Sequence, residues 1–207
     1  MNKLSLKELT RQLQLCEIGL TRDTIEYTPL LGVYHRHEWD HGYGTTYGYN
    51  GSRRAFYADM REMMGFLIDY YNISDTKEII IAPCYRYNQF DERYYYFKEM
   101  PGVDIFDEIR KFLRKQGVRR SDRTGIKIPV LGNDSILEML LEGSFRGVSE
   151  FCLFSFENKV LIEPNHHFDL AFWTHEFDEV RGIINGILPK YPNLNYYDMY
   201  TREEAKW

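Results

Sequence analysis

The chain has 207 residues, of which 43% are hydrophobic and 28% charged, a composition typical of globular rather than disordered proteins. Its formal net charge of −5 argues against a general attraction to nucleic acid, although a local basic patch remains compatible with it. Residues 1–20 contain no long apolar run, and no stretch of about 18 apolar residues follows, so we expect neither a signal peptide nor a membrane span.

The three cysteines, Cys16, Cys84 and Cys152, are far apart and lie in apolar surroundings. They show no CxxC spacing and do not form an even set, which argues against a disulfide framework or a zinc knuckle. We therefore expect buried free thiols in a reducing cytoplasm. Cys84 follows Pro83 in an apolar segment, so we interpret it as a core residue rather than a nucleophile.

The first elements are predicted from caps and from the spacing of apolar side chains. Residues 5–8 (SLKE) form a capping box, which predicts a helix over 6–16. An extended segment follows at 24–34, and Pro29 inside it indicates an edge strand. Apolar residues at helical spacing then predict a helix over 55–71.

Two later stretches, 78–113 and 149–188, share an order of strand, turn, strand and helix. They contain nearly the same five residues, FDEIR at 106–110 and FDEVR at 177–181. Hairpins imply antiparallel pairing, so the pattern predicts an α+β fold with two α-β-β-α units. We hypothesise that the units arose by internal duplication; the alternative is a chance match between two amphipathic helices.

The chain divides into five segments, which we expect to form one compact domain. A capping box at 135–138 predicts the first helix of the second unit, and Pro164 is expected to interrupt a strand there. The aromatic tail is expected to pack back on the body. The segments are an N-terminal helix, extended segment and Gly/Tyr/His loop (1–54), the first unit (55–117), a linker (118–133), the second unit (134–188) and the tail (189–207).

The clearest candidate for chemistry is the run HRHEWDH at 35–41, with three imidazoles and two carboxylates within seven residues. These groups are ligands that divalent transition metals favour, and a bound metal could supply hydroxide near neutral pH. The run resembles the HxHxDH signature of the metallo-β-lactamase family, with one additional residue before the Asp-His pair. The resemblance implies a metal-dependent hydrolase that binds zinc or manganese through His35, His37, Asp40 and His41. The alternative is a glycine-rich loop with solvated histidines.

A second group of imidazoles and carboxylates occurs between residues 163 and 178. Alternation along a strand would place His167 and Asp169 on one face and His166 on the other. Carboxylates at the start of the last helix are also favoured by its dipole, without any catalytic role. Whether this group meets the run at 35–41 depends on the fold. Its members are Glu163, His166, His167, Asp169, His175, Glu176 and Asp178.

No motif for a nucleophile or a phosphate-binding loop occurs, because GxSxG, GxxxxGK(S/T) and GxGxxG are all absent. A basic run between 110 and 127 offers nucleic-acid binding as a second alternative function, and a solvated helix face is its simpler interpretation. The run consists of Arg110, Lys111, Arg114, Lys115, Arg119, Arg120, Arg123 and Lys127.

The leading hypothesis is a soluble, non-catalytic binding protein that acts on a protein partner, such as a toxin-immunity or anti-defence inhibitor. No complete catalytic motif is present, the charge is acidic, and the 17 tyrosines suit a protein-binding surface. We expect the partner to contact a glycine-rich surface loop after residue 34, and we expect no membrane partner. The predicted contact residues are Trp39, Asp40, Tyr43, Tyr47 and Tyr49.

Overall fold

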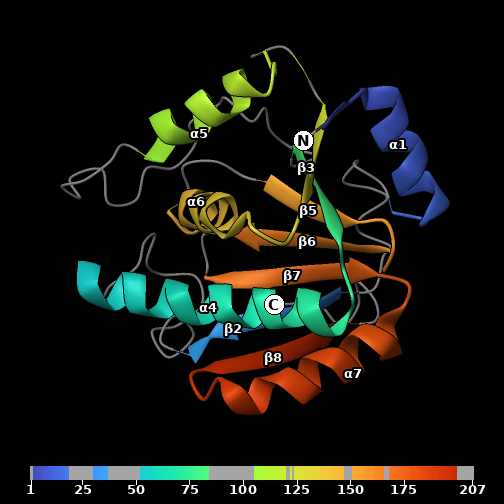
Figure 1. Ribbon diagram of the computed structural model, residues 1–207. Coiled ribbons are helices and arrows are strands. Elements are labelled where there is room, and N and C mark those ends of the chain that lie inside the picture. Colours follow the sequence, from blue (N-terminus) through green and yellow to red (C-terminus); the bar gives the residue numbers. More distant parts are fainter. Residues whose placement is uncertain are drawn as a thin grey trace.

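The computed structural model describes residues 2–18, 30–36, 52–83, 105–119, 122, 124–146, 151–165 and 168–199. Within these residues the chain forms one eight-stranded sheet in the order β1-β4-β3-β5-β6-β7-β2-β8, together with five α-helices (Figure 1). Every pair of neighbouring strands is antiparallel, which confirms the predicted α+β class.

Strands and helices alternate along the described chain except at β5, β6 and β7, which follow one another without a helix between them. The strands are β1 (Asn2–Leu4), β2 (Leu30–His35), β3 (Glu78–Pro83), β4 (Gly125–Pro129), β5 (Phe151–Ser155), β6 (Val160–Asn165), β7 (Asp169–Thr174) and β8 (Leu194–Met199). The helices are α1 (Leu6–Leu15), α4 (Arg53–Ile73), α5 (Ile105–Lys115), α6 (Asp134–Phe145) and α7 (Phe177–Ile187), and a 3-10 turn, η1 (Leu188–Lys190), follows α7.

A side-chain cap explains where α1 begins but not where α6 begins. Ser5 accepts a hydrogen bond from the Glu8 amide at 3.2 Å, so the first predicted cap is confirmed. The cap predicted at Ser135 is wrong, because α6 begins at Asp134 and Asn133 occupies the N-cap position. The Asn133 side chain donates instead to the Pro129 carbonyl at 2.8 Å and so stabilises the turn before the helix.

The two faces of the sheet are covered differently. The larger core lies between one face and α4, α5, α6 and α7, and it takes alternate residues such as Leu31 and Val33 of β2. In Figure 1, α4 lies in front of the sheet on this side. The other face packs Leu9 and Leu13 of α1 against residues of β3, β5 and β6. Strands β2 and β8 contribute no described residue to this second cluster.

Three expectations about strands differ from the structure. The strand before residue 36 is internal rather than at an edge, because β8 of the tail pairs with β2 on the side away from β7. The segment 118–133, predicted as a linker, contributes β4 to the sheet. Pro164 lies within β6; the pairing of β6 with β5 ends at Ile162, so the missing amide of Pro164 removes no bond to β5.

The internal duplication is not confirmed. The second unit has three strands between α6 and α7, whereas β3 is the one described strand between α4 and α5, and the predicted return strand 93–98 lies outside the described residues. Phe106 and Phe177 are both buried, with the guanidinium groups of Arg110 and Arg181 5.2 and 5.4 Å from the ring centroids. Each arginine also pairs with the aspartate three residues before it. The shared pentapeptide is therefore explained by a local helix-face arrangement.

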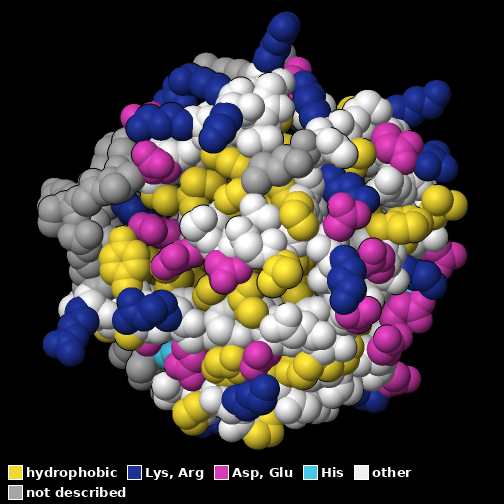
Figure 2. All heavy atoms as spheres, in the orientation of Figure 1, with side chains coloured by type: hydrophobic (Ala, Val, Ile, Leu, Met, Phe, Trp, Pro, Cys, Tyr) yellow, Lys and Arg dark blue, Asp and Glu magenta, His cyan; other side chains and the backbone are white. Residues whose placement is uncertain are grey.

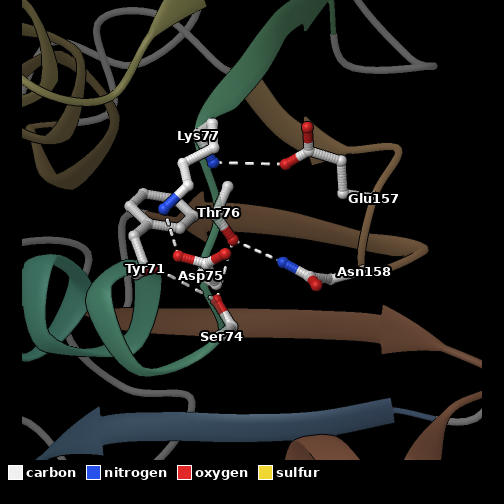
Figure 3. Close-up of polar contacts among 7 residues, drawn as sticks. All are labelled: Tyr71, Ser74, Asp75, Thr76, Lys77, Glu157 and Asn158. Atoms are coloured by element: carbon white, nitrogen blue, oxygen red, sulfur yellow. Dashed lines mark hydrogen bonds and ion pairs between the residues drawn. The ribbon is translucent and has the colours of Figure 1, made fainter.

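One end of the sheet, here called the hairpin end, is closed by polar contacts between the α4–β3 turn and the β5–β6 hairpin (Figure 3). The Asn158 side chain donates to Thr76, and the Lys77 amide donates to Glu157 at 3.2 Å. Ser74 and Thr76 share a hydrogen bond of 2.7 Å. These contacts satisfy polar groups where the chain leaves the helix for the sheet. The opposite end, where β2 stops at His35, is called the His35 end below.

Candidate functional site

The His35 end brings together the described parts of the two histidine-containing groups. Strands β2 and β7 pair with Tyr34 opposite Asp169, and the His35 amide donates to the Phe168 carbonyl at 3.1 Å. Side chains alternate along a strand, so Tyr34 and Asp169 share one face while His35 lies on the other. The backbones of the two groups are therefore adjacent, but the side chains of His35 and Asp169 lie on opposite faces of the sheet.

The His35 side chain is completely buried between the sheet and α4. Its Nε2 atom lies 3.5 Å from a carboxylate oxygen of Asp59 and 3.5 Å from one of Glu62, both on α4. Glu62 also accepts hydrogen bonds from the amide and the side chain of Asn193, at 3.2 and 3.0 Å. His35 thus contributes to a polar cluster that joins α4 to β2 and to the turn before β8. This position differs from the solvated loop that was the alternative interpretation.

Most of the run at 35–41 lies outside the described residues, which include His35 and Arg36. Within the described ranges, no group of three or more His, Cys, Asp and Glu side chains is arranged to hold a metal ion. The other predicted ligands and partner contacts lie outside the described residues: His37, Trp39, Asp40, His41, Tyr43, Tyr47 and Tyr49.

The second predicted group does not form a single site. Asp169 is at the His35 end of β7, whereas His175 and Glu176 follow the other end of the same strand. Six residues of strand separate these ends by roughly 20 Å. At the hairpin end, Glu176 forms an ion pair of 2.6 Å with Lys159. Glu163 lies on β6, beside β7, on the same face of the sheet as Asp169. His166 and His167 lie outside the described residues.

The side chains that gather around Asp169 come from four neighbouring strands, β6, β7, β2 and β8, on the sheet face opposite α4. We call this surface the polar face. The strand register places them in rows that cross the sheet. The first row is Asn195, Tyr34, Asp169 and Asn165, the second is Tyr197, Gly32, Ala171 and Glu163, and the third contains Leu30, Trp173 and Leu161.

Tyr197 lies across the second row and reaches into the first. Its hydroxyl donates a hydrogen bond to Oδ2 of Asp169 at 3.1 Å. The ring passes directly over Gly32, where an added Cβ would lie 1.9 Å from the ring atom Cζ. Tyr34 lies beside Tyr197, with ring centroids 6.1 Å apart, and its hydroxyl accepts a bond of 3.0 Å from Asn195. Glycine at position 32 is therefore required for this close approach.

Asp169 is fully buried, and burial raises the pKa of its carboxyl group to about 7, with the nearby charge of Glu163 acting in the same direction. The hydrogen bond from Tyr197 opposes this rise, as does the side chain of Asn165. Its other oxygen, Oδ1, accepts no hydrogen bond from any residue that the structure describes. Groups whose pKa is shifted in this way are concentrated at functional sites.

The Asp169 backbone follows a strained residue. Phe168 has φ of 60°, a left-handed conformation that is unusual for a bulky side chain. Its buried ring stacks on Phe145 at 4.4 Å and meets Phe56 edge-on at 5.3 Å. The aromatic packing on the α4 side holds Phe168 in this conformation, so that Asp169 enters β7 with its side chain on the polar face.

Trp173 completes the polar face. Its indole Nε1 donates to Glu163 at 3.2 Å, across the β6–β7 pair. Trp173, Tyr34, Tyr197 and Glu163 are half-buried, so part of each remains open to solvent. Among the described residues of this face, Glu163 and Asp169 carry charge and there is no Lys or Arg. The arrangement is an aromatic surface with two carboxylates.

Sequence reasoning singled out Glu163 and Asp169 but missed their aromatic and glycine neighbours. A signal existed in the alternation of Leu30, Gly32 and Tyr34 along an apolar strand. The pairing of that strand with the C-terminal tail carries no local signal, because residues 32 and 197 are far apart in the chain. The contribution of Tyr197 therefore emerges from the sheet order.

The basic run between 110 and 127 lies mainly on the exposed side of α5. Figure 2 shows Lys and Arg side chains gathered over and beside this helix at the top of the view. Lys111 pairs within the helix with Glu108 at 3.2 Å, and Lys127 pairs on the sheet with Glu78. Arg120 and Arg123 lie outside the described residues.

Comparison of the chain with protein-family models, with curated proteins and with solved structures gives no match. Within the described residues, no helix has the length and apolar character needed to cross a membrane.

Proposed function

We propose that the chain is a non-catalytic binding protein that recognises a protein partner through the polar face. The observation that carries this proposal is the set of half-buried aromatic side chains held on rigid strands by hydrogen bonds: Tyr34, Trp173 and Tyr197. Such rings offer a large contact area with little loss of conformational entropy, because their positions are already restricted. A binding surface built on strands is also more precisely positioned than one built on a loop.

The charge of the polar face supports a basic partner. Its two described charged groups, Asp169 and Glu163, are acidic, and the whole chain carries a net charge of −5. Complementary charge increases the rate of association and disfavours acidic competitors. A small acidic protein that covers a basic surface of an enzyme or toxin would act as an immunity or anti-defence inhibitor. The predicted contacts at 39–49 follow β2 in the chain and belong to the same proposal.

The test is capture of the partner from native lysate of the source organism, followed by affinity measurements with the purified partner. Trp173→Ala should weaken binding by more than about 1 kcal/mol, or about fivefold, because it removes the largest ring of the polar face. Leu131→Ala is the matched control: this apolar side chain is 91% exposed and follows β4, which lies four strands away from β7 in the sheet. Thermal unfolding of both variants separates lost contacts from lost stability.

Unchanged affinity for Trp173→Ala together with weakened affinity for Leu131→Ala would move the binding surface to the β4 side of the sheet and overturn the proposal. Catalytic conversion of the purified partner by this chain, with release of a reaction product, would also overturn the proposal.

A further inference from the structure

The hairpin end of the sheet exposes several large apolar side chains. Among the described residues, five such side chains are exposed, and three of them lie at this end. They are Ile73, the last residue of α4, Leu131, which follows β4, and Phe156, which follows β5. Single exposed apolar side chains are common on protein surfaces, whereas a group of them indicates an interaction surface.

Backbone hydrogen bonds place two of these side chains on either side of Lys77. The Lys77 carbonyl accepts a bond of 2.9 Å from the amide of Val130, the residue before Leu131. The Lys77 amide donates to Glu157, the residue after Phe156 (Figure 3). The strand order β4-β3-β5 and the usual spacing of strands put the backbones at Leu131 and Phe156 roughly 10 Å apart. The apolar side chains therefore belong to one surface at the end of three neighbouring strands.

This surface is held in place by its own hydrogen bonds. Asn158 of the hairpin donates to Thr76, and Ser74 and Thr76 share a bond of 2.7 Å (Figure 3). These bonds fix the α4–β3 turn against the β5–β6 hairpin. A surface that is already ordered loses little conformational entropy on association.

The charged groups beside the apolar side chains indicate what covers them. Both signs are present: Lys77 pairs with Asp75 within the turn, and Lys159 pairs with Glu176 at 2.6 Å. These pairs are exposed and therefore weak, so that the lysines are free to contact carboxylates of another molecule. A two-fold axis brings the same surface of two copies together, and a surface with both signs places cations of each copy opposite carboxylates of the other. The polar face, by contrast, would place carboxylates against carboxylates.

We propose that the hairpin end is the interface of a two-fold symmetric homodimer, in which the exposed apolar side chains of two copies pack against one another. The apolar contact is small, so we expect a weak dimer with a Kd of about 1–100 µM. Strands β7, β2 and β8, which carry most of the polar face, form the other half of the sheet. The dimer therefore leaves both polar faces free, and the inference does not rest on the proposed function.

The experiment is sedimentation equilibrium of the intact chain at concentrations from about 1 to 500 µM, a range that brackets the expected Kd. The average mass should rise with concentration from 24.8 kDa towards twice that value. Leu131→Glu should weaken dimerisation at least tenfold, because each change occurs twice in a two-fold interface. Leu131 is 91% exposed, so this variant should fold, and thermal unfolding checks that it does.

The matched control is Leu6→Glu, which adds the same charge at another exposed leucine, the first residue of α1. The neighbouring Leu4 pairs with Gly125 at the start of β4, whereas Leu131 follows the end of that strand. Leu6 is therefore distant from the proposed interface, and Leu6→Glu should dimerise as the wild type does. A mass of 24.8 kDa at every concentration would overturn the inference, as would equal dimerisation of the two variants.

The same variants separate the dimer from the proposed function. Leu131→Glu should bind the purified partner with the wild-type affinity per chain, since the polar face is unchanged. A monomeric wild type whose partner binds Leu131→Glu more weakly would assign the hairpin end to that partner and overturn the dimer. If the dimer forms as expected but no partner depends on Trp173, the dimer stands and the proposed function fails.

Discussion

Replacing Asp169 with asparagine should change how the stability of the protein depends on pH. In the folded protein the pKa of this carboxyl group is about 7, whereas an exposed aspartate has a pKa near 3.8. Between these values the folded state keeps the proton and the unfolded state releases it. The folded state thus binds more protons, so the free energy of unfolding decreases as the pH rises from about 4 to about 7 and is constant above that range. Asparagine cannot ionise and should remove this decrease.

The size of the effect follows from the two pKa values. A difference of about three pKa units corresponds to about 4 kcal/mol in the free energy of unfolding. The asparagine oxygen can still accept the bond from Tyr197, but its amide group replaces the Oδ1 atom that has no described donor and costs about 1–3 kcal/mol at every pH. At pH 8 the variant should therefore be more stable than the wild type by about 1–3 kcal/mol, and at pH 4 it should be less stable.

Urea unfolding followed by tryptophan fluorescence at several pH values between 4 and 8 measures this directly. The informative quantity is the stability difference between variant and wild type, which should change by about 4 kcal/mol over that range, since the constant cost of the amide cancels. Asp198→Asn, on the exposed side of β8, controls for removal of one negative charge. Parallel stability curves for wild type and Asp169→Asn would refute the raised pKa of the buried Asp169 carboxyl group.

The remaining predictions concern the backbone of the polar face, the polar cluster around His35 and the loop after β2. Gly32→Ala should lower stability by about 1–3 kcal/mol in urea unfolding, because its Cβ would collide with the Tyr197 ring, whereas Gly182→Ala, with open space around it in α7, should raise stability by up to about 1 kcal/mol. Equal effects of these two changes would contradict the close approach of Tyr197. His35→Ala should cost about 2–5 kcal/mol, since it leaves a cavity where a fully buried side chain packs between the sheet and α4, and elemental analysis should find the same metal content in variant and wild type; joint loss of a stoichiometric metal and of an activity would instead support the hydrolase alternative. Trp39→Ala should weaken binding of the captured partner by more than about 1 kcal/mol, as measured by calorimetry, with thermal unfolding unchanged; full affinity would exclude this residue from the interface.

The helices of this protein follow from local properties of the sequence. The apolar spacing in 55–71 and the cap at Ser5 predict α4 and α1 because helix geometry and capping depend on residues within a few positions of one another. The α+β class follows from the predicted hairpins, because hairpins imply antiparallel pairing. Similarly, the shared FDE(I/V)R residues form a local ion pair and carry a buried ring on each of two helices.

The neighbours of each strand are decided by the tertiary structure. Pro29 indicated an edge strand, yet β2 lies between β7 and β8. The reason is that β8, from the C-terminal tail, pairs with the side of β2 that faces away from β7. The same pairing places Tyr197 over Gly32 and next to Asp169, which no spacing along the chain predicts. His35 shows the complementary case: its position in a histidine-rich run indicated a metal ligand, but strand alternation and the approach of α4 bury it between two carboxylates. Periodicity determines which side chains share a face, whereas the partner of that face depends on which distant segments bury the most surface together.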